Sequence, residues 1–174
     1  ETPLLQQWDL KAQLLFSPSY EFHDVAALSN NVVVLADIHH RGLTIKDAKP
    51  KSSVPHKRLE ILDLSFCPRH VSVDECDKIY VLDDNKVKIF CKKGEFLSQF
   101  TSITYNGKKP SCLAVDDDLI AVGYFNSGKL SLYNKNTTVK IKTIVAPMIN
   151  DYLTIYKKTF IYTSWVNKKL LSVD

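Results

Sequence analysis

The feature that most constrains the fold is a four-strand pattern that recurs along the chain at nearly constant spacing. Its clearest copy is PRHVSVDECDKIYVLDDNKVKIFCKKGEFLSQF, where four apolar or alternating segments are separated by short polar turns. Matched apolar positions fall at Val25, Val71, Leu113 and Leu153, which are 46, 42 and 40 residues apart. Four strands per unit at a period of about 40–45 residues are typical of β-propeller blades. The sequence therefore predicts an all-β fold, a β-propeller of about four four-stranded blades.

We expect a single propeller domain or propeller fragment over residues 1–174, with blades at roughly 21–63, 67–103, 110–145 and 150–174. The fourth unit stops after its third strand, whereas Leu4–Trp8 parallels the outer strand EFLSQF of the second unit. Two architectures are open. Either Leu4–Trp8 completes the fourth blade and closes a small ring, or the chain is part of a larger propeller. Open blade edges would allow self-association.

Composition excludes few functions. The chain has 174 residues, of which 24% are charged, and its net charge of +4 permits an anionic partner without requiring one. No apolar run approaches the roughly 20 residues of a membrane span, so no membrane contact is expected. The first residues show no signal peptide, which favours a cytoplasmic location, although a mature secreted chain would look the same.

Cysteine spacing leaves the redox state open. The sequence has four cysteines, and no two of them form a C-x-x-C pair: Cys67, Cys76, Cys91 and Cys112. A zinc ribbon and a thioredoxin-type motif are therefore both unsupported. Two disulfides in a secreted protein remain the alternative to reduced thiols, and reduced thiols are preferred because a domain of this size has no need of covalent staples.

The second unit resembles an NHL repeat. The residues that carry this resemblance are Pro68, Val71-Ser72-Val73-Asp74, Ile79-Tyr80-Val81, Asp83, Asn85, Val87-Lys88-Ile89-Phe90 and Gly94-Glu95-Phe96. The first unit matches more weakly through Ala36-Asp37, and the third and fourth units are degenerate. Departures are the shortage of glycine and Lys86 in place of arginine.

The resemblance implies a propeller, commonly of six blades, of the kind found at the C-terminus of TRIM-type ubiquitin ligases. In those proteins the domain selects a protein partner or an RNA target. No RING or B-box cysteine–histidine pattern occurs in this sequence, so the resemblance brings no ligase chemistry to these residues. WD-type propellers are the competing relatives, but no Trp-Asp dipeptide ends a third strand here.

Several polar residues of the sequence are candidates for chemistry. His39-His40 falls in an expected turn, and because adjacent side chains on extended backbone point apart, a metal site is not favoured. Asp74 and Asp116 end inner strands. Each carboxylate could line the channel, but we expect it instead to accept hydrogen bonds from backbone N–H groups of the following turn. His23 and His70 precede matching inner strands, so we expect them to face one end of the channel together. No catalytic residue, metal site or cofactor is predicted.

Loops and rims are left to carry function, so we predict a non-enzymatic recognition module that binds a protein partner through rim loops. The alternative is RNA binding through a basic rim, with aromatic residues that stack on bases. A channel-sited, metal-dependent lyase or hydrolase is the least favoured hypothesis. The candidate binding residues are Arg41, Lys92, Lys93, Lys108, Lys109, Tyr124, Phe125, Trp165, Lys168 and Lys169. Blade packing of the aromatics and solvation of the lysines are the competing interpretations.

Overall fold

Four antiparallel sheets account for nearly all regular structure in the computed structural model, which describes residues 22–47, 57–59, 66–116, 118–164 and 168–174. The first sheet contains β1 (Asp24–Leu28), β2 (Val32–Asp37), β3 (Gly42–Asp47) and β4 (Lys57–Leu59). The second contains β5 (Pro68–Val73), β6 (Ile79–Asp83), β7 (Lys86–Phe90) and β8 (Phe96–Thr101). The third contains β9 (Pro110–Val115), β10 (Leu119–Tyr124), β11 (Lys129–Asn134) and β12 (Lys140–Val145). The last contains β13 (Leu153–Tyr156), β14 (Thr159–Ser164) and β15 (Lys169–Val173).

Each sheet is a meander in which successive strands pair with their sequence neighbours, as short polar turns require. The strands of the second unit are found where the quoted pattern places them: KVKIF is β7, and EFLSQF overlaps β8. The one helical element among the described residues is a 3-10 turn, η1 (Ser29–Asn31). None of the described helical residues forms a segment long and apolar enough to cross a membrane.

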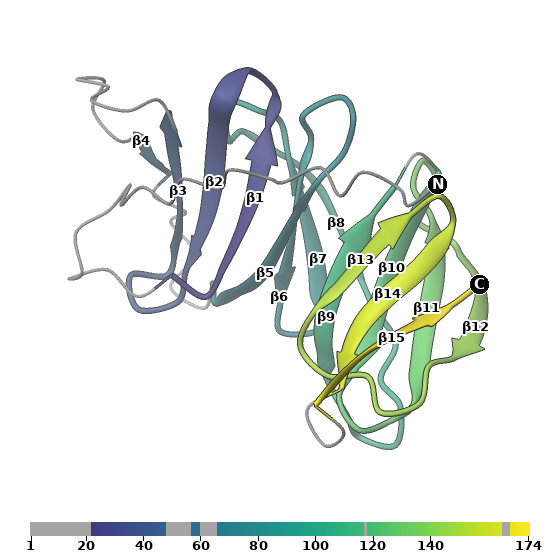
Figure 1. Ribbon diagram of the computed structural model, residues 1–174. Coiled ribbons are helices and arrows are strands. Elements are labelled where there is room, and N and C mark those ends of the chain that lie inside the picture. The colour runs from purple at the N-terminus through teal and green to yellow at the C-terminus, as the bar shows by residue number, and fades with distance from the viewer. Residues whose placement is uncertain (1–21, 48–56, 60–65, 117, 165–167) are drawn as a thin grey trace, which may run out of the picture.

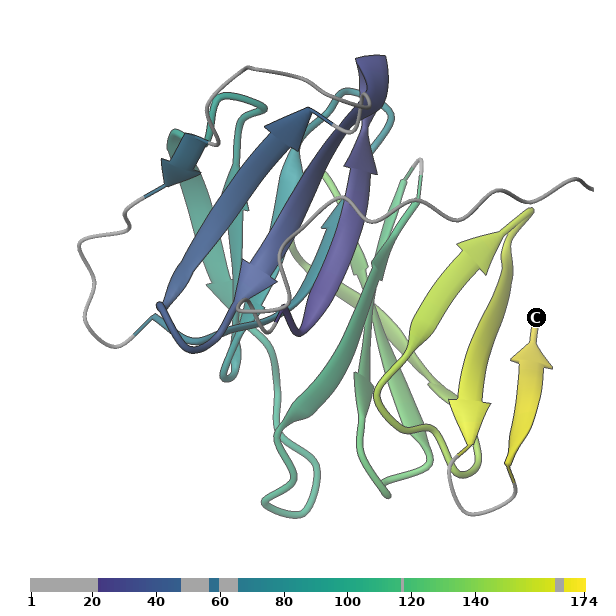
Figure 2. The same cartoon turned by 60° about the vertical axis from the view of Figure 1, so that its left-hand side comes forward.

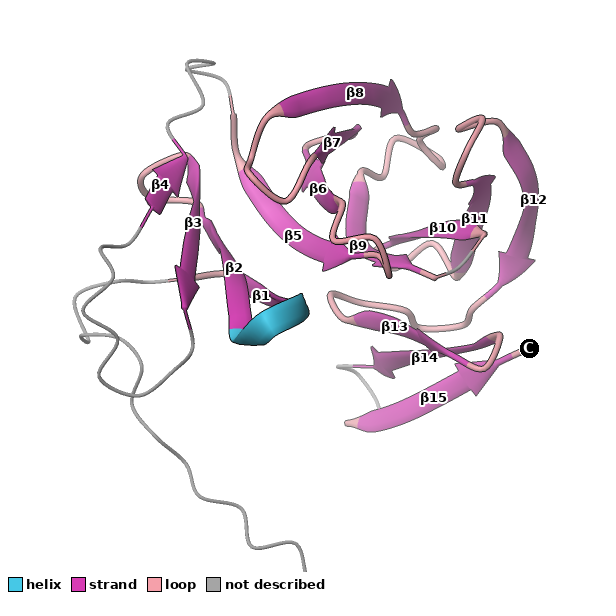
Figure 3. Cartoon of the chain, turned by 90° about the horizontal axis from the view of Figure 1, so that it is seen from above, coloured by secondary structure: helices cyan, strands magenta, loops and turns pink. Residues whose placement is uncertain are grey.

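The first strands of the four sheets lie toward a common centre, and the last strands lie at the periphery (Figure 3). Contacts link β1 to β5, β5 to β9, and β9 to β13. Figure 3 also shows the sheets following one another in sequence order around this centre, and Figure 2 shows β15 as the outermost strand of the fourth sheet. The fourth sheet has three strands among the described residues. The expected partner of β15, Leu4–Trp8, lies outside the described residues.

The core consists of layers between successive sheets, because each middle strand sends alternate side chains to its two neighbours. In β6, Ile79 and Val81 pack toward the first sheet, whereas Tyr80 and Leu82 pack toward the third. All four side chains are at most 1% exposed. A strand buried on both faces explains why KIYVL reads as a continuous apolar run.

The same layering fixes one glycine. Gly123 in β10 lies opposite Cys112 in β9. A Cβ at position 123 would come within 2.4 Å of the Cys112 sulfur and 2.7 Å of Ile149 Cδ1. The residue is glycine here because the third and fourth sheets leave no room for a side chain.

The inner strands all run in the same direction around the centre, so the connections between strands separate onto two faces. The lower face in Figure 1 is where the inner strands begin, and the upper face is where they end. Contacts between neighbouring sheets confirm the separation. On the upper face, the Ser29 backbone N–H donates to Asp77 at 2.7 Å; on the lower face, Lys109 pairs with Asp84 at 2.7 Å.

Candidate functional site

All four inner strands line one central channel of about 340 Å³, contributing residues 24–27, 70–73, 113–115 and 151–154. The matched repeat positions Val25, Val71, Leu113 and Leu153 are all among them. The channel is therefore a direct product of the repeat, because equivalent positions of successive blades face the same axis.

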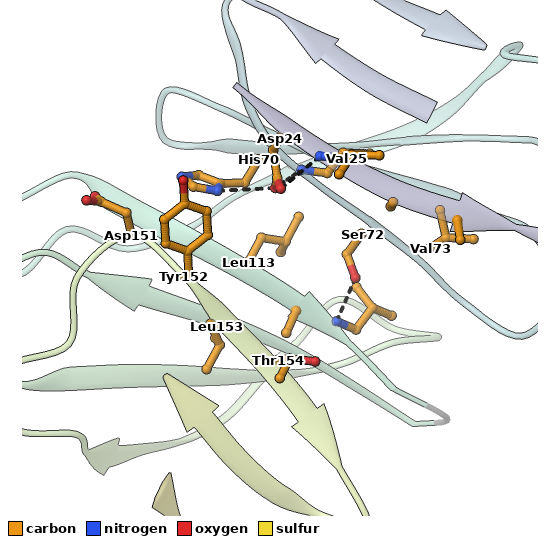
Figure 4. A pocket seen from close by; sticks show the side chains of 15 residues that line it. Asp24, Val25, His70, Ser72, Val73, Leu113, Asp151, Tyr152, Leu153 and Thr154 are labelled. Carbon is orange, nitrogen blue, oxygen red and sulfur yellow. Dashed lines mark hydrogen bonds and ion pairs between the residues drawn. The ribbon is translucent and has the colours of Figure 1, made fainter. Parts of the chain in front are cut away.

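A carboxylate and an imidazole lie together at the lower end of the channel (Figure 4). Asp24 accepts hydrogen bonds from the backbone N–H groups of Val25 at 2.9 Å and Val71 at 3.0 Å. Its Oδ2 also lies 3.3 Å from Nδ1 of His70, whose side chain is 5% exposed. Because a fixed carboxylate faces Nδ1, the neutral imidazole carries its proton there and keeps Nε2 as an acceptor.

Two further rings surround His70. His23 donates from Nδ1 to the Arg69 carbonyl at 2.7 Å, and its ring meets His70 edge-on with centroids 5.3 Å apart. The two histidines lie side by side as expected, but only His70 is among the residues that line the channel. Tyr152 meets His70 from another side at 6.3 Å and remains 52% exposed. In Figure 4 its ring extends toward His70 at the channel mouth.

A second hollow, of about 440 Å³, lies next to the channel mouth on the lower face. Three cations, Arg69, Lys108 and Lys109, line it together with Phe125, which is 41% exposed. Asp151 lines both this groove and the channel. We call this second hollow the basic groove.

Charge divides unevenly between the two faces of the described chain. The exposed cations of the lower face are Arg41, Arg69, Lys86, Lys108, Lys109, Lys168 and Lys169. The acidic residues there are half-buried or buried: Asp24, Asp37, Asp83, Asp84 and Asp151. The upper face mixes signs, with the exposed residues Glu75, Lys78, Lys92, Lys93, Glu95, Asp118, Lys157, Lys158 and Asp174. Positive potential therefore concentrates on the lower face.

The structure divides the predicted binding residues accordingly. Lys108, Lys109 and Phe125 meet in the basic groove. Arg41 ends the β2–β3 turn on the same face, and Lys168 and Lys169 line a separate hollow of about 490 Å³ at the start of β15. Lys92 and Lys93 lie in the β7–β8 turn on the upper face, so they cannot join the others in one surface.

Two aromatic candidates need separate treatment. Tyr124 is fully buried in the layer between the second and third sheets, where its ring meets Tyr105 at 4.8 Å. A surface-binding role for Tyr124 is therefore wrong, because β10 is a middle strand with both faces covered. Trp165 lies outside the described residues.

Tyr105 is half-buried and ties the β8–β9 connection to the third sheet. Its hydroxyl hydrogen-bonds with Ser131 at 3.1 Å and with Thr143, and it accepts from Lys140 at 3.0 Å. Burial alone would raise the pKa of Tyr105, but these hydrogen bonds and the Lys140 charge lower it overall. These hydrogen bonds give Tyr105 a structural role as a link between the second and third blades.

The preferred capping role of Asp74 is confirmed. Its Oδ1 accepts from the backbone N–H groups of Cys76 at 3.0 Å and Lys78 at 2.9 Å, and its Oδ2 accepts from the Tyr80 hydroxyl at 3.0 Å. Asp37 caps its turn in the same way, because its Oδ1 accepts from the His40 backbone N–H at 2.9 Å and its Oδ2 lies 2.7 Å from His40 Nδ1. Within the described ranges, no group of three or more His, Cys, Asp or Glu side chains is placed to hold a metal ion.

Comparison with known proteins supports the fold class. No protein-family model matches the chain, and no curated protein sequence matches it. Solved structures do match: a catalytically inactive virginiamycin B lyase from Staphylococcus aureus with quinupristin has a TM-score of 0.66 and 11% identity, over 91% of this chain and 54% of that one. The WD40 repeats of RRP9 give a TM-score of 0.60 and 8% identity, over 92% and 53%.

The chain spans about half the length of these proteins and of streptogramin B lyase, of which it covers 56%. The computationally designed Ika4 protein is matched over 98% of its length, with a TM-score of 0.62 and 12% identity over 94% of this chain. At these identities the likeness shows the fold alone, which is that of a β-propeller. The matches include WD40-type and lyase propellers and do not single out the NHL repeat.

Sequence reasoning missed Arg69, Asp151 and Tyr152 as site residues. A usable signal was present for Tyr152, because Asp24, His70, Cys112 and Tyr152 each directly precede a matched apolar position of the repeat. Asp24, His70 and Tyr152 line the channel. The equivalent residue of the third blade, Cys112, is buried between sheets instead.

Proposed function

We propose that this chain is a non-enzymatic recognition module that binds a partner protein through the loops of its lower face. The observation that carries the proposal is the concentration of exposed cations on that face, against half-buried or buried acidic residues. Such a surface is complementary to an acidic segment and accelerates its encounter. The propeller acts as the rigid support, since its inner and middle strands are committed to packing.

The test uses a fluorescein-labelled oligoglutamate peptide and follows its anisotropy as the protein is added. Replacing Arg41 and Lys168 by glutamate should weaken binding by about tenfold or more, because each change removes attraction and adds repulsion. Binding that is unaffected by these changes would contradict the assignment of the lower face.

RNA is the second candidate, favoured by one specific observation. Phe125 and Tyr152 are exposed aromatics on the cationic face, and base–aromatic stacking with backbone neutralisation is the usual basis of single-strand binding. A labelled single-stranded oligouridine should then bind with an affinity that falls steeply between low and moderate salt. A salt-insensitive affinity, or none, would remove this candidate.

A channel-sited lyase is a third hypothesis, and its only support is the orientation of His70 by Asp24. A His70→Gln variant would abolish turnover of any substrate found. Two results together would favour the recognition module: the variant still binds the oligoglutamate peptide, and no turnover that depends on His70 is detected.

A further inference from the structure

The channel and the basic groove are neighbouring hollows of the lower face and together make a two-part site. They share Asp151, and the adjacent residues Arg69 and His70 belong one to each. Volumes of about 340 and 440 Å³ fall within the usual range for small-molecule sites. The mouth of the channel carries the acceptors Asp151 and His70, and the groove carries three cations, which defines the chemistry of a ligand that would fill both.

The channel mouth offers acceptors beside an aromatic face. His70 Nδ1 lies 3.3 Å from Asp24 Oδ2, which leaves Nε2 of the neutral ring as an acceptor. In the described chain, the Asp151 carboxylate makes no hydrogen bond or ion pair with another residue. The exposed ring of Tyr152 lies next to both in Figure 4. A planar ligand group with hydrogen-bond donors on its edge matches this arrangement.

The basic groove offers positive charge for an anionic group. Lys109 is already paired with Asp84, whereas the side chains of Arg69 and Lys108 have no ion pair within the described ranges. An arginine beside a lysine is well suited to phosphate, because guanidinium binds two oxygens at once and ammonium adds charge.

Asp151 sets the orientation of such a ligand. Its negative charge repels phosphate from the channel mouth and attracts donor groups there, while Arg69 and Lys108 draw phosphate into the groove. Asp24 adds further negative charge at the channel mouth, and Asp84 is neutralised by Lys109. The two parts therefore cannot exchange roles.

We propose that this two-part site binds a nucleoside monophosphate, with the base against Tyr152 and the phosphate at Arg69 and Lys108. Guanine is the preferred base, because its ring N–H and amino group are adjacent donors that one carboxylate can accept together. The ligand is a free nucleotide or the equivalent unit of an RNA strand. This small-molecule site goes beyond the proposed protein recognition, although both use the lower face.

The experiment is titration calorimetry of the whole chain with GMP, UMP and inorganic phosphate at one fixed ionic strength. GMP should bind, and UMP and phosphate should bind at least about tenfold more weakly, since UMP offers Asp151 one donor in place of two and phosphate offers no base. Asp151→Asn and Arg69→Gln should each weaken GMP by about tenfold, and Tyr152→Ala should weaken it by a similar factor. Lys92→Gln on the upper face is the control and should leave the affinity unchanged.

GMP binding no tighter than inorganic phosphate would overturn the proposal, as would an Asp151→Asn variant with unchanged affinity. A guanosine-containing RNA trinucleotide that competes with GMP would support the shared chemistry, whereas RNA that binds without competing would contradict it. The peptide assay distinguishes this failure from that of the proposed function, because oligoglutamate binding should survive Tyr152→Ala.

Discussion

Replacing Gly123 by alanine tests the layered packing of the blades at its tightest point. The new Cβ would lie 2.4 Å from the Cys112 sulfur and 2.7 Å from Ile149 Cδ1, well inside contact distance. Overpacking of this kind costs about 1–3 kcal/mol. For a chain of this size each kcal/mol lowers Tm by about 2–4 °C, so Gly123→Ala should lower Tm by roughly 2–12 °C.

The refuting comparison is a double-mutant cycle measured by urea unfolding. Cys112→Ala removes the sulfur that the new methyl group meets, so the double variant should be more stable than additivity predicts by about 1 kcal/mol. Gly107→Ala is the control: it adds a methyl group in open space at φ +72, so its cost is backbone strain that Cys112→Ala cannot relieve. A Gly123→Ala variant as stable as the parent, or no recovery in the double variant, would refute the packing.

Three further predictions follow from buried polar groups. Asp74→Ala should lower the free energy of unfolding by about 2 kcal/mol, because it leaves two backbone donors of a half-buried turn without an acceptor; urea titration measures this. Lys88→Met should lower the free energy of unfolding by about 3 kcal/mol or more, because the buried Asp83 carboxylate loses the ammonium that lies 2.7 Å from it. A second substitution, Asp83→Asn, should recover part of this loss because it removes the unpaired charge. Burial raises the pKa of Cys112 to about 12, so its thiolate is scarce at pH 8 and maleimide should label exposed Cys76 but spare Cys112 until unfolding, as mass spectrometry would show.

Strand order was predictable because the determinants are local. Alternating or apolar segments such as KIYVL, bounded by Asp and Asn turns, define both the strands and their pairing with sequence neighbours. The low glycine content was no obstacle, since Asp77, Asp84 and Asn106 adopt positive φ in these turns. The period then predicts which positions share the central axis.

The candidate site was less predictable because it depends on which face each connection reaches and on how sheets curve. Lys92 and Lys108 look alike in sequence, yet they occupy opposite faces. Tyr124 is the last residue of β10 and is fully buried, whereas Phe125, the next residue, is 41% exposed, so one residue of register decides between core and surface. Asp151 becomes part of a site only because the second, third and fourth sheets converge near it.

The most direct test of the central claim compares equal charge changes on the two faces. Lys108→Glu with Lys109→Glu alters the lower face, and Lys92→Glu with Lys93→Glu alters the upper face by the same net charge. Anisotropy of the labelled oligoglutamate peptide should show at least about tenfold weaker binding for the lower-face variant and less than about twofold change for the upper-face variant. Equal losses in both variants would mean that only net charge matters, and would contradict a binding surface on the lower face.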